Sequence, residues 1–140
     1  MADVRSTPGI AQAVAASALR AQQARMRIIA ENLANASSTA RTPGGEPYRR
    51  QAPVFEATRL PNGATGVKMA RVQGDQSAFR SEYEPGNPAA GPDGYVSLPN
   101  VNSLVEALDM REAQRAYEAN LNVIETARAM EMRTLDLLKK

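Results

Sequence analysis

The sequence predicts a mainly α protein with a small β part, in which long N- and C-terminal helices form an antiparallel coiled-coil-like pair. A β-hairpin and an extended Pro/Gly-rich arm are predicted between them. Both ends of the chain combine helix-forming residues with apolar residues at heptad spacing, whereas Pro and Gly cluster in the middle. The chain also has only two Phe, four Tyr and no Trp. Since large aromatic side chains usually anchor compact cores, their scarcity favours elongated helix packing.

The C-terminal helix is predicted over residues 101–139, because no Gly or Pro interrupts the chain after Pro99. Asn102 or Ser103 can cap its start, and Glu106 follows Ser103 at the capping-box spacing. Its apolar residues recur at heptad spacing at Ala107, Met110, Tyr117, Leu121, Ile124, Leu135 and Leu138. A second row beside them contains Val123, Ala127, Met130 and Leu137. Such a stripe requires a partner helix rather than a globular core.

The N-terminal helix is predicted over residues 8–36, because Thr7 can cap a helix whose first residue is Pro8. Its apolar seam contains Leu19, Met26, Ile29, Leu33 and Ala36. Residues 1–50 carry seven Arg and three acidic residues, whereas residues 100–140 carry six basic and seven acidic residues. This opposite charge bias suits the pairing of the two helices into one helical domain.

The composition of the N-terminal helix also supports a second interpretation. Residues 8–36 contain three Arg among many Ala, with Glu31 as the acidic residue. A basic amphipathic helix of this kind can bind a membrane surface or a coiled-coil partner, or serve as a transit peptide. The paired helix is favoured because the C-terminal end supplies a matching stripe, and the basic amphipathic-helix module is the alternative.

The middle segment, residues 37–100, contains two different kinds of structure. A β-hairpin is predicted over about residues 52–72, where two strand-like pieces flank the turn signal Pro-Asn-Gly at residues 61–63. Residues 83–96 contain too many Gly and Pro residues for a regular element. We therefore expect an extended arm over about residues 80–98, with Tyr83, Tyr95 and Val96 as its anchors.

The composition argues against most chemical functions. A chain without Cys or His has no disulfide, no thiolate or His-ligated metal site and no Cys-His or Ser-His catalysis. No apolar run is long enough to cross a bilayer, and the N-terminus lacks the features of a cleaved secretory signal. The acidic residues of the middle segment do not form a Ca²⁺-binding loop, and we assign them to the solvated surface; they are Asp75, Glu82, Glu84 and Asp93. The scattered Arg residues do not interleave with aromatics as in nucleic-acid-binding surfaces. We expect no enzyme activity, catalytic residue, cofactor, metal, nucleic acid or small-molecule substrate.

Several motifs occur in an order and spacing typical of one protein family. Ser-Ala-Leu at residues 17–19 is followed by Arg-Ile-Ile-Ala-Glu-Asn-Leu-Ala-Asn at residues 27–35 and Ser-Thr at residues 38–39. Further motifs are residues 47–51 with 54–55, 83–86, 94–96, 99–102, and 116–120 with Met130. Together they resemble the axial proteins of the bacterial flagellar rod and hook, and within them the proximal rod proteins of the basal body.

This resemblance implies a structural subunit that self-assembles with other rod proteins into a hollow drive shaft. The shaft would transmit torque, let export substrates pass and be needed for flagellum assembly and motility. Residues 8–36 and 101–139 would form the inner, D0-like helical domain. Implied partners are copies of the chain, other rod subunits, the rod-base adaptor and MS-ring proteins, and the flagellar type III export apparatus. The subunit would be exported without a cleaved signal peptide and would assemble in the periplasmic part of the basal body.

The residues expected to make these contacts fall into two groups. The helix-packing and assembly residues are Leu19, Met26, Ile29, Leu33, Asn32, Asn35, Tyr117, Asn120, Leu121, Ile124, Met130, Leu135 and Leu138. The middle-segment contact residues are Tyr48, Arg49, Phe55, Tyr83, Tyr95 and Val96. Asn32 and Asn35 suit either a solvated helix end or hydrogen bonds that fix the register of packed helices, and the resemblance favours register.

Overall fold

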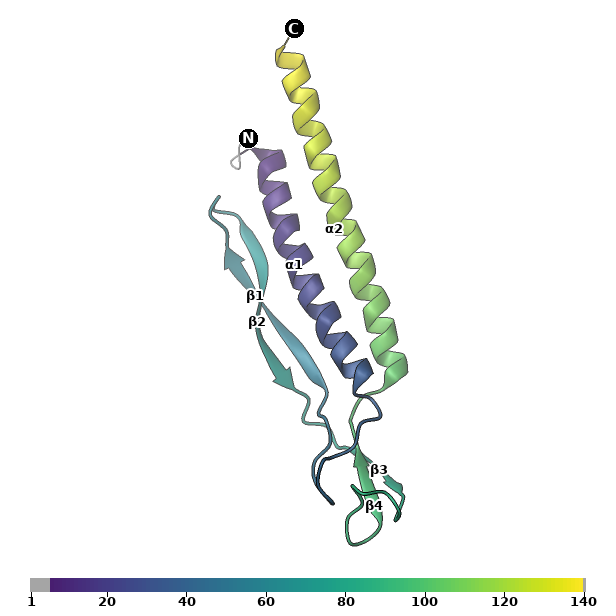
Figure 1. The fold of residues 1–140 in the computed structure, drawn as a ribbon. Helices are drawn as coiled ribbons and strands as arrows, with labels where there is room; N and C mark the ends of the chain where they lie inside the picture. The colour runs from purple at the N-terminus through teal and green to yellow at the C-terminus, as the bar shows by residue number, and fades with distance from the viewer. Residues whose placement is uncertain (1–5, 140) are drawn as a thin grey trace. The chain divides into compact units, whose positions relative to one another are not determined.

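The computed structural model describes residues 6–139, with two long helices and two hairpins between them. In chain order the elements are α1 (Thr7–Ala34), β1 (Gln51–Arg59), β2 (Thr65–Gly74), β3 (Arg80–Tyr83), β4 (Tyr95–Leu98) and α2 (Ser103–Leu138) (Figure 1). The predicted fold class, mainly α with a β-hairpin between long terminal helices, is confirmed. None of the described helices is both long and apolar enough to cross a membrane. The prediction that the N-terminus lacks a secretory signal involves residues 1–5, which lie outside the described residues.

The described residues form two compact units, and each long helix contributes to both. The first unit contains the described residues up to Met26, the hairpin residues Val54–Arg71 and the described residues from Glu112 onward. The second unit contains Arg27–Pro53 and Val72–Arg111. The buried side chains of the first unit are small, whereas those of the second combine larger apolar residues with the polar Asn32 and Glu106.

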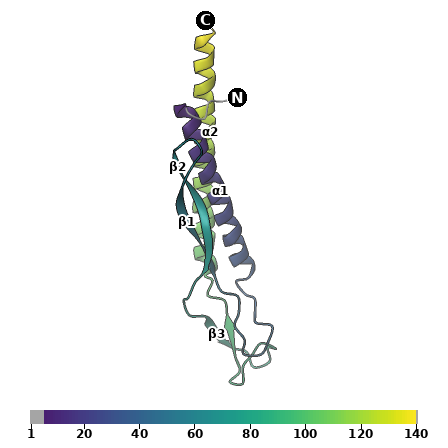
Figure 2. The same ribbon diagram turned by 90° about the vertical axis from the view of Figure 1, so that its left-hand side faces the viewer.

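In the first unit α1 and α2 lie side by side and run antiparallel (Figures 1 and 2). Gln12 near the start of α1 donates a hydrogen bond from Nε2 to Glu131 Oε2 near the end of α2, at 3.1 Å. Farther along α1, the Arg25 guanidinium lies 3.6 Å from the Glu112 carboxylate. Low residue numbers on one helix therefore lie beside high numbers on the other, as expected for an antiparallel pair.

The face of α2 that packs on α1 in this unit follows alternating four- and three-residue spacing. Its buried or half-buried members are Ala113, Tyr117, Asn120, Ile124, Ala127 and Glu131. The sequence analysis included Tyr117 and Ile124 but took Leu121 as the intervening member of its apolar row. Leu121 is 39% exposed, whereas Ala113 is fully buried. The small side chains of Ala113 and Ala127 allow the two helix backbones to approach closely, and the larger Tyr117 and Ile124 are half-buried on the same face.

The β1–β2 hairpin covers the other side of α1 in the first unit (Figure 2). Its turn contains Gly63 with a φ of 86°, a conformation that glycine adopts without strain. The hydroxyl of Ser17 on α1 accepts a hydrogen bond from the Val67 backbone N–H at 3.2 Å and donates one to the Val14 carbonyl at 2.7 Å. Ser17 is 2% exposed, so this hydroxyl joins a helix to a strand inside the unit.

In the second unit β3 and β4 form a second antiparallel hairpin, with Arg80 opposite Leu98 and Tyr83 opposite Tyr95. The sequence analysis expected an extended arm over this stretch. Residues 84–94 are indeed turns and irregular backbone, but the short segments on either side pair as strands. The Tyr83 and Tyr95 rings pack edge to face with centroids 5.3 Å apart. The pairing escaped sequence analysis because each strand has only four residues.

At Gly66 the hairpin packs so closely on α1 that no space remains for a side chain. A Cβ atom added there would lie 2.6 Å from Ser17 Oγ and 3.0 Å from a Leu60 methyl carbon. We expect Gly66→Ala to lower the free energy of unfolding by about 1–3 kcal/mol, because the added methyl group overpacks a buried contact. Urea titration followed by circular dichroism measures the change. The control is Gly86→Ala, where an added Cβ meets nothing within 4 Å, and equal losses in the two variants would contradict this account.

Candidate functional site

The second unit contains a buried cluster of polar side chains, called here the polar cluster. Its members are Asn32, Tyr48, Arg50, Gln51, Asp75, Asn100 and Glu106. Glu106 is fully buried and Asn32 is 1% exposed. The start of α2 places Glu106 there, because Asn102 Oδ1 caps the helix by accepting hydrogen bonds from the Leu104 and Val105 N–H groups at 3.1 and 3.3 Å.

Asn32 uses every hydrogen-bonding position of its side-chain amide. Its Oδ1 accepts from the Tyr48 hydroxyl at 2.7 Å and from the Gln51 N–H at 2.9 Å. Its Nδ2 donates to the Gln51 carbonyl at 2.8 Å and to Glu106 Oε2 at 3.3 Å. The amide therefore bonds to both backbone groups of Gln51, as a neighbouring strand would, and also reaches the first turns of α2. A full set of partners is what the burial of an amide requires.

Arg50 provides the positive charge of the polar cluster. Its Nε donates a hydrogen bond to Glu106 Oε1, and its terminal nitrogens lie 3.5 Å from Asp75 Oδ2 and 3.8 Å from Asp109 Oδ2. Burial by itself would lower the pKa of Arg50, but the hydrogen bond to Glu106 and the charges of the three carboxylates raise it above its usual value. Arg50 therefore stays charged and neutralises the buried Glu106 carboxylate.

Asn100 connects the polar cluster to the loop that follows β2. It accepts a hydrogen bond from the Arg50 backbone N–H at 2.7 Å and donates to the Asp75 and Ser77 carbonyls at 2.9 and 3.1 Å. Hydrogen bonds from the Ser77 backbone and hydroxyl, together with the nearby Arg50, lower the pKa of Asp75. The sequence analysis assigned Asp75 to the solvated surface; its side chain is 31% exposed and faces Arg50.

The polar cluster is built to hold segments together rather than to react. Its charged groups are paired, and it contains no Cys or His. Among residues 6–139 no group of three or more possible metal-binding side chains occurs. In the sequence, Arg50 stands out only as part of a family motif, and Glu106 only as a capping residue. The spacing of Glu106 with Ala113 and Ala127 is the signal that places its carboxylate on the packed face of α2.

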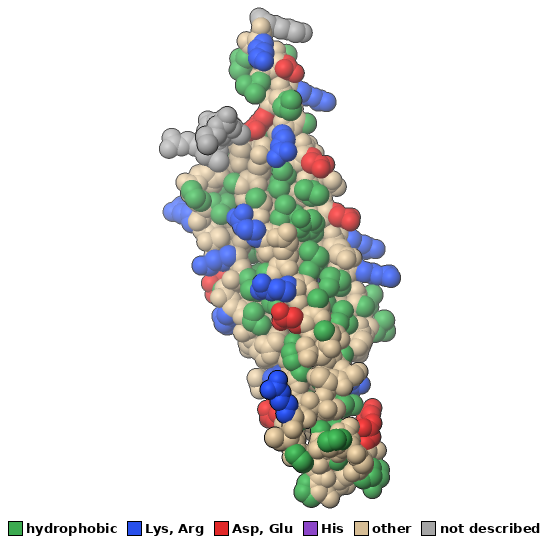
Figure 3. All heavy atoms as spheres, in the orientation of Figure 1, with side chains coloured by type: hydrophobic (Ala, Val, Ile, Leu, Met, Phe, Trp, Pro, Cys, Tyr) green, Lys and Arg blue, Asp and Glu red, His purple; other side chains and the backbone are tan. Residues whose placement is uncertain are grey.

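The first unit has a different prominent feature, an exposed apolar surface along α2. We define the α2 apolar surface as the large apolar side chains that α2 exposes in the first unit, among its described residues. They are Leu121, Val123, Met130, Met132, Leu135, Leu137 and Leu138. Apolar side chains (green) are visible along the molecular surface in Figure 3. The last three are 59%, 73% and 78% exposed. Large apolar side chains exposed in this number along one helix are typical of an interaction site.

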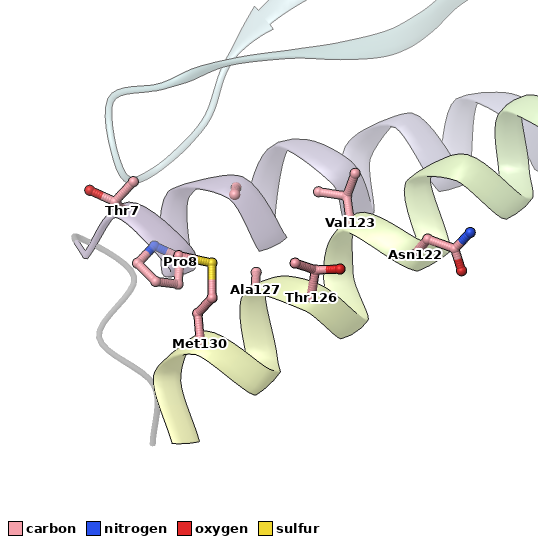
Figure 4. Close-up of a pocket in the computed structure, with 8 residues that line it drawn as sticks. Thr7, Pro8, Asn122, Val123, Thr126, Ala127 and Met130 are labelled. Atoms are coloured by element: carbon pink, nitrogen blue, oxygen red, sulfur yellow. The ribbon is translucent and has the colours of Figure 1, made fainter. Parts of the chain in front are cut away.

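A hollow of about 300 Å³ lies at one edge of the α2 apolar surface, between the start of α1 and α2. Its lining residues are Thr7, Pro8 and Ala11 of α1 and Asn122, Val123, Thr126, Ala127 and Met130 of α2. The Met130 side chain extends toward Pro8 across the two helices (Figure 4). The walls are almost entirely apolar, so the hollow continues the α2 apolar surface and offers no catalytic groups.

The residues predicted for helix packing and assembly occupy different environments. In the first unit Leu19, Met26, Tyr117, Asn120 and Ile124 are half-buried, and Leu121, Met130, Leu135 and Leu138 are exposed. In the second unit Ile29 and Asn32 are buried, and Leu33 and Asn35 are half-buried. The Asn35 and Asn120 amides each donate to a carbonyl of their own helix, Glu31 at 2.8 Å and Ala116 at 2.7 Å. Among these three asparagines, Asn32 is the one whose side chain joins α1 to α2, through Glu106.

The predicted middle-segment residues are similarly divided. Tyr48, Arg49 and Phe55 are half-buried, Tyr83 and Tyr95 are exposed, and Val96 is buried. The Arg49 guanidinium lies 4.4 Å from the centre of the Phe79 ring and donates a hydrogen bond to the Asp75 carbonyl at 2.8 Å. Val96, with 1% exposure, packs inside its own unit. Tyr83 and Tyr95 are therefore the members of this group most accessible to a partner.

Glu106 gives a direct test of the polar cluster. We expect Glu106→Gln to lower the free energy of unfolding by about 3 kcal/mol, because breaking a buried ion pair leaves a charge poorly compensated. Urea titration followed by circular dichroism measures the loss. Glu112→Gln is the control on the same helix, since the Glu112 side chain is 72% exposed in its pair with Arg25. That variant should lose less than about 0.5 kcal/mol, and a similar loss in both would contradict a special role of the buried pair.

The environment of Tyr48 predicts that the free energy of unfolding falls at high pH. Burial, and then the charges of Glu31 and Glu106, raise its pKa above the usual 10.0. The folded state thus favours the neutral phenol. The contribution of Tyr48 to the free energy of unfolding is therefore complete below pH 10.0, and it is lost as the pH rises through the raised pKa. Urea titrations on either side of that pH should show a smaller drop for Tyr48→Phe than for wild type. Tyr83→Phe, at an exposed position, is the control that should keep the full drop; an unchanged drop in Tyr48→Phe would refute the assignment.

Comparison with known proteins assigns the chain to a family. The model described as "Flagella basal body rod protein" matches residues 13–41, and "Flagellar basal body rod FlgEFG protein C-terminal" matches residues 93–137. The flagellar basal-body rod protein FlgC of Agrobacterium fabrum (strain C58) is 48% identical over 131 residues, which cover 92% of this chain and 94% of that protein. FlgC of Salmonella typhimurium (strain LT2) is 44% identical over 125 residues, covering 89% and 92% of the two chains. FlgC of Bacillus subtilis (strain 168) is 35% identical over 142 residues, covering 90% and 95%.

These similarities agree with the motifs found in the sequence and extend over nearly the whole chain. They do not favour the alternative, a basic amphipathic-helix module for a membrane surface or coiled-coil partner. Because the relatives are rod proteins and cover at least 89% of this chain, the same structural, non-enzymatic role applies here. The chain is therefore a structural component of the flagellar basal-body rod, and it belongs to the FlgC family of flagellar basal-body rod proteins.

Proposed function

We propose that the chain is a subunit of the proximal rod and assembles with copies of itself and other rod subunits into a hollow drive shaft. The shaft transmits torque, lets export substrates pass and is needed for flagellum assembly and motility. The observation that carries this proposal is the α2 apolar surface. Its exposed leucines, valine and methionines gain free energy when a neighbouring subunit removes them from water, at roughly 25 cal/mol per Å² of apolar area.

The proposal divides the chain by role. Residues 8–36 and 101–139 form the inner, D0-like helical domain, and residues 37–100 form the outer segment. In this division the exposed assembly residues Leu121, Met130, Leu135 and Leu138 contact neighbouring helices. Asn32 fixes the register of α1 and α2 through its bond to Glu106. Tyr83 and Tyr95, exposed on the second hairpin, contact other subunits.

The position in the cell and the further partners follow from the same proposal. The subunit leaves the cytoplasm through the flagellar type III export apparatus, without a cleaved signal peptide, and assembles in the periplasmic part of the basal body. The rod-base adaptor and the MS-ring proteins are its partners at the base of the rod. Before assembly the exposed apolar residues of the helix ends are poorly ordered, and these ends fold as they dock.

A complementation experiment tests the rod function and the α2 apolar surface together. Cells that lack the gene should recover swimming and rods with the wild-type gene, but not with Leu135→Asp, which places a charge in the proposed contact. Thr134→Asp is the control, since it adds the same charge at the adjacent exposed position, outside the apolar surface. Swimming in soft agar and electron microscopy of basal bodies are the measurements.

The outcomes separate the two parts of the proposal. If deletion leaves rods and swimming intact, the rod function fails. If deletion abolishes them and Leu135→Asp restores them as well as Thr134→Asp does, the rod function stands and the α2 apolar surface is not an assembly contact. Immunoblots of secreted and cell-associated protein confirm that each variant is made and exported.

A further inference from the structure

Methionine is the only source of sulfur in this chain. The sequence contains six Met and no Cys. Peroxides oxidise the thiolate of Cys and the thioether of Met, so in a chain without Cys the sulfur chemistry falls on Met alone. Met1 lies outside the described residues, and the described methionines are Met26, Met69, Met110, Met130 and Met132. Which of them reacts first depends on how easily the oxidant reaches each sulfur atom.

Two of the described methionines are more accessible than the other three. More than half of the surface of Met130 and of Met132 is exposed, whereas Met26, Met69 and Met110 are half-buried. Both exposed methionines belong to the α2 apolar surface. The most reactive sulfur atoms of the described chain are therefore expected on the surface that is proposed to contact other subunits.

Met130 also lines the apolar hollow of about 300 Å³ between the start of α1 and α2. Its side chain extends toward Pro8 of α1, as Figure 4 shows. A water molecule needs only about 30 Å³, so an oxidant as small as hydrogen peroxide fits in the hollow beside the sulfur atom. An oxygen atom added to this sulfur would lie against mainly apolar walls. Met132 does not share the hollow, because residues two apart on a helix do not face the same way.

We propose that Met130 and Met132 form a reversible oxidation site that controls whether the α2 apolar surface can dock. The thioether sulfur attacks one oxygen atom of hydrogen peroxide, the O–O bond breaks, and the second oxygen leaves as water. Sulfur loses two electrons and keeps the first oxygen as a sulfoxide, which methionine sulfoxide reductases convert back. The sulfoxide oxygen accepts hydrogen bonds from water, and a docking neighbour would have to remove that water. The effect on assembly rests on the proposed function, whereas the selectivity of oxidation does not.

Peptide mass spectrometry tests the selectivity. Full-length protein is exposed briefly to hydrogen peroxide, at a concentration where gel filtration shows free chains, and sulfoxide is measured at each Met. Conversion at Met130 and Met132 should be several-fold faster than at Met26, Met69 and Met110, which serve as internal controls. The difference should disappear in concentrated urea, because the fold creates it. Equal rates in the native protein, or the same preference in urea, would overturn the assignment.

Two double variants test the consequence for assembly in cells that lack the gene. Met130→Gln with Met132→Gln adds polar groups that imitate the sulfoxide, whereas Met130→Leu with Met132→Leu stays apolar and cannot be oxidised. The Leu variant should restore swimming and rods as wild type does, and the Gln variant should restore swimming several-fold less. Ala129→Gln with Thr134→Gln is the control, since it adds the same side chains at exposed positions outside the α2 apolar surface.

The outcomes separate the oxidation site from the rod function. If the Gln variant at Met130 and Met132 restores swimming as fully as the control does, the rod function stands and the proposed control of docking fails. If deletion leaves swimming intact, the rod function fails and the control of docking fails with it, while the peptide measurement still decides the oxidation site. In purified protein, peroxide should abolish the self-association of wild type but not of the Leu variant. A loss that methionine sulfoxide reductases do not reverse would overturn the reversible site.

Discussion

The ion pair between Arg50 and Glu106 is the constraint on which the second unit depends. A fully buried carboxylate is tolerated only with a charged partner and further hydrogen bonds, and Glu106 has both, from Arg50 and Asn32. Satisfying it determines where the end of α1, the segment before β1 and the start of α2 meet. Asn100 and Asp75 extend the same requirement to the segments that follow β2 and β4. The unit also buries the apolar side chains of Ile28, Ile29, Val96 and Val101, and the directional bonds of the polar cluster add a defined geometry to that apolar packing.

The first unit satisfies a different requirement. Its buried positions are alanines and Ser17, which bury little apolar area each but allow helices and hairpin to approach closely. The larger apolar side chains of α2 remain at the surface. In this unit the fully buried side chains are therefore small, and several larger apolar side chains of α2 stay available for contact with other molecules. This division suits a subunit whose stability depends on its neighbours, because burial of large side chains contributes most of the hydrophobic free energy.

The sequence revealed the features that depend on local order. Uninterrupted helix formers predicted both helices, and the turn around Gly63 predicted the first hairpin. Features that depend on distant segments were missed. Ala113 was absent from the predicted rows because a search for periodicity favours large apolar residues, whereas close packing of α1 on α2 favours small ones. The bonds of Asn32 to the Gln51 backbone leave no compositional trace. Asp75 looked like a surface acid because Arg50, its partner, is 25 residues away in the sequence.

The distribution of residues around α2 follows from what a polymerising subunit requires. A helix pair that buried its largest apolar residues internally would form a stable monomer with little to gain from assembly. A subunit with one self-complementary binding surface would stop at a dimer, because an isologous contact buries that surface on both partners. The exposed apolar side chains of α2 supply attraction without direction, so the direction of growth must come from other groups. Continued growth, which a rod needs, requires attraction between unlike surfaces of neighbouring subunits.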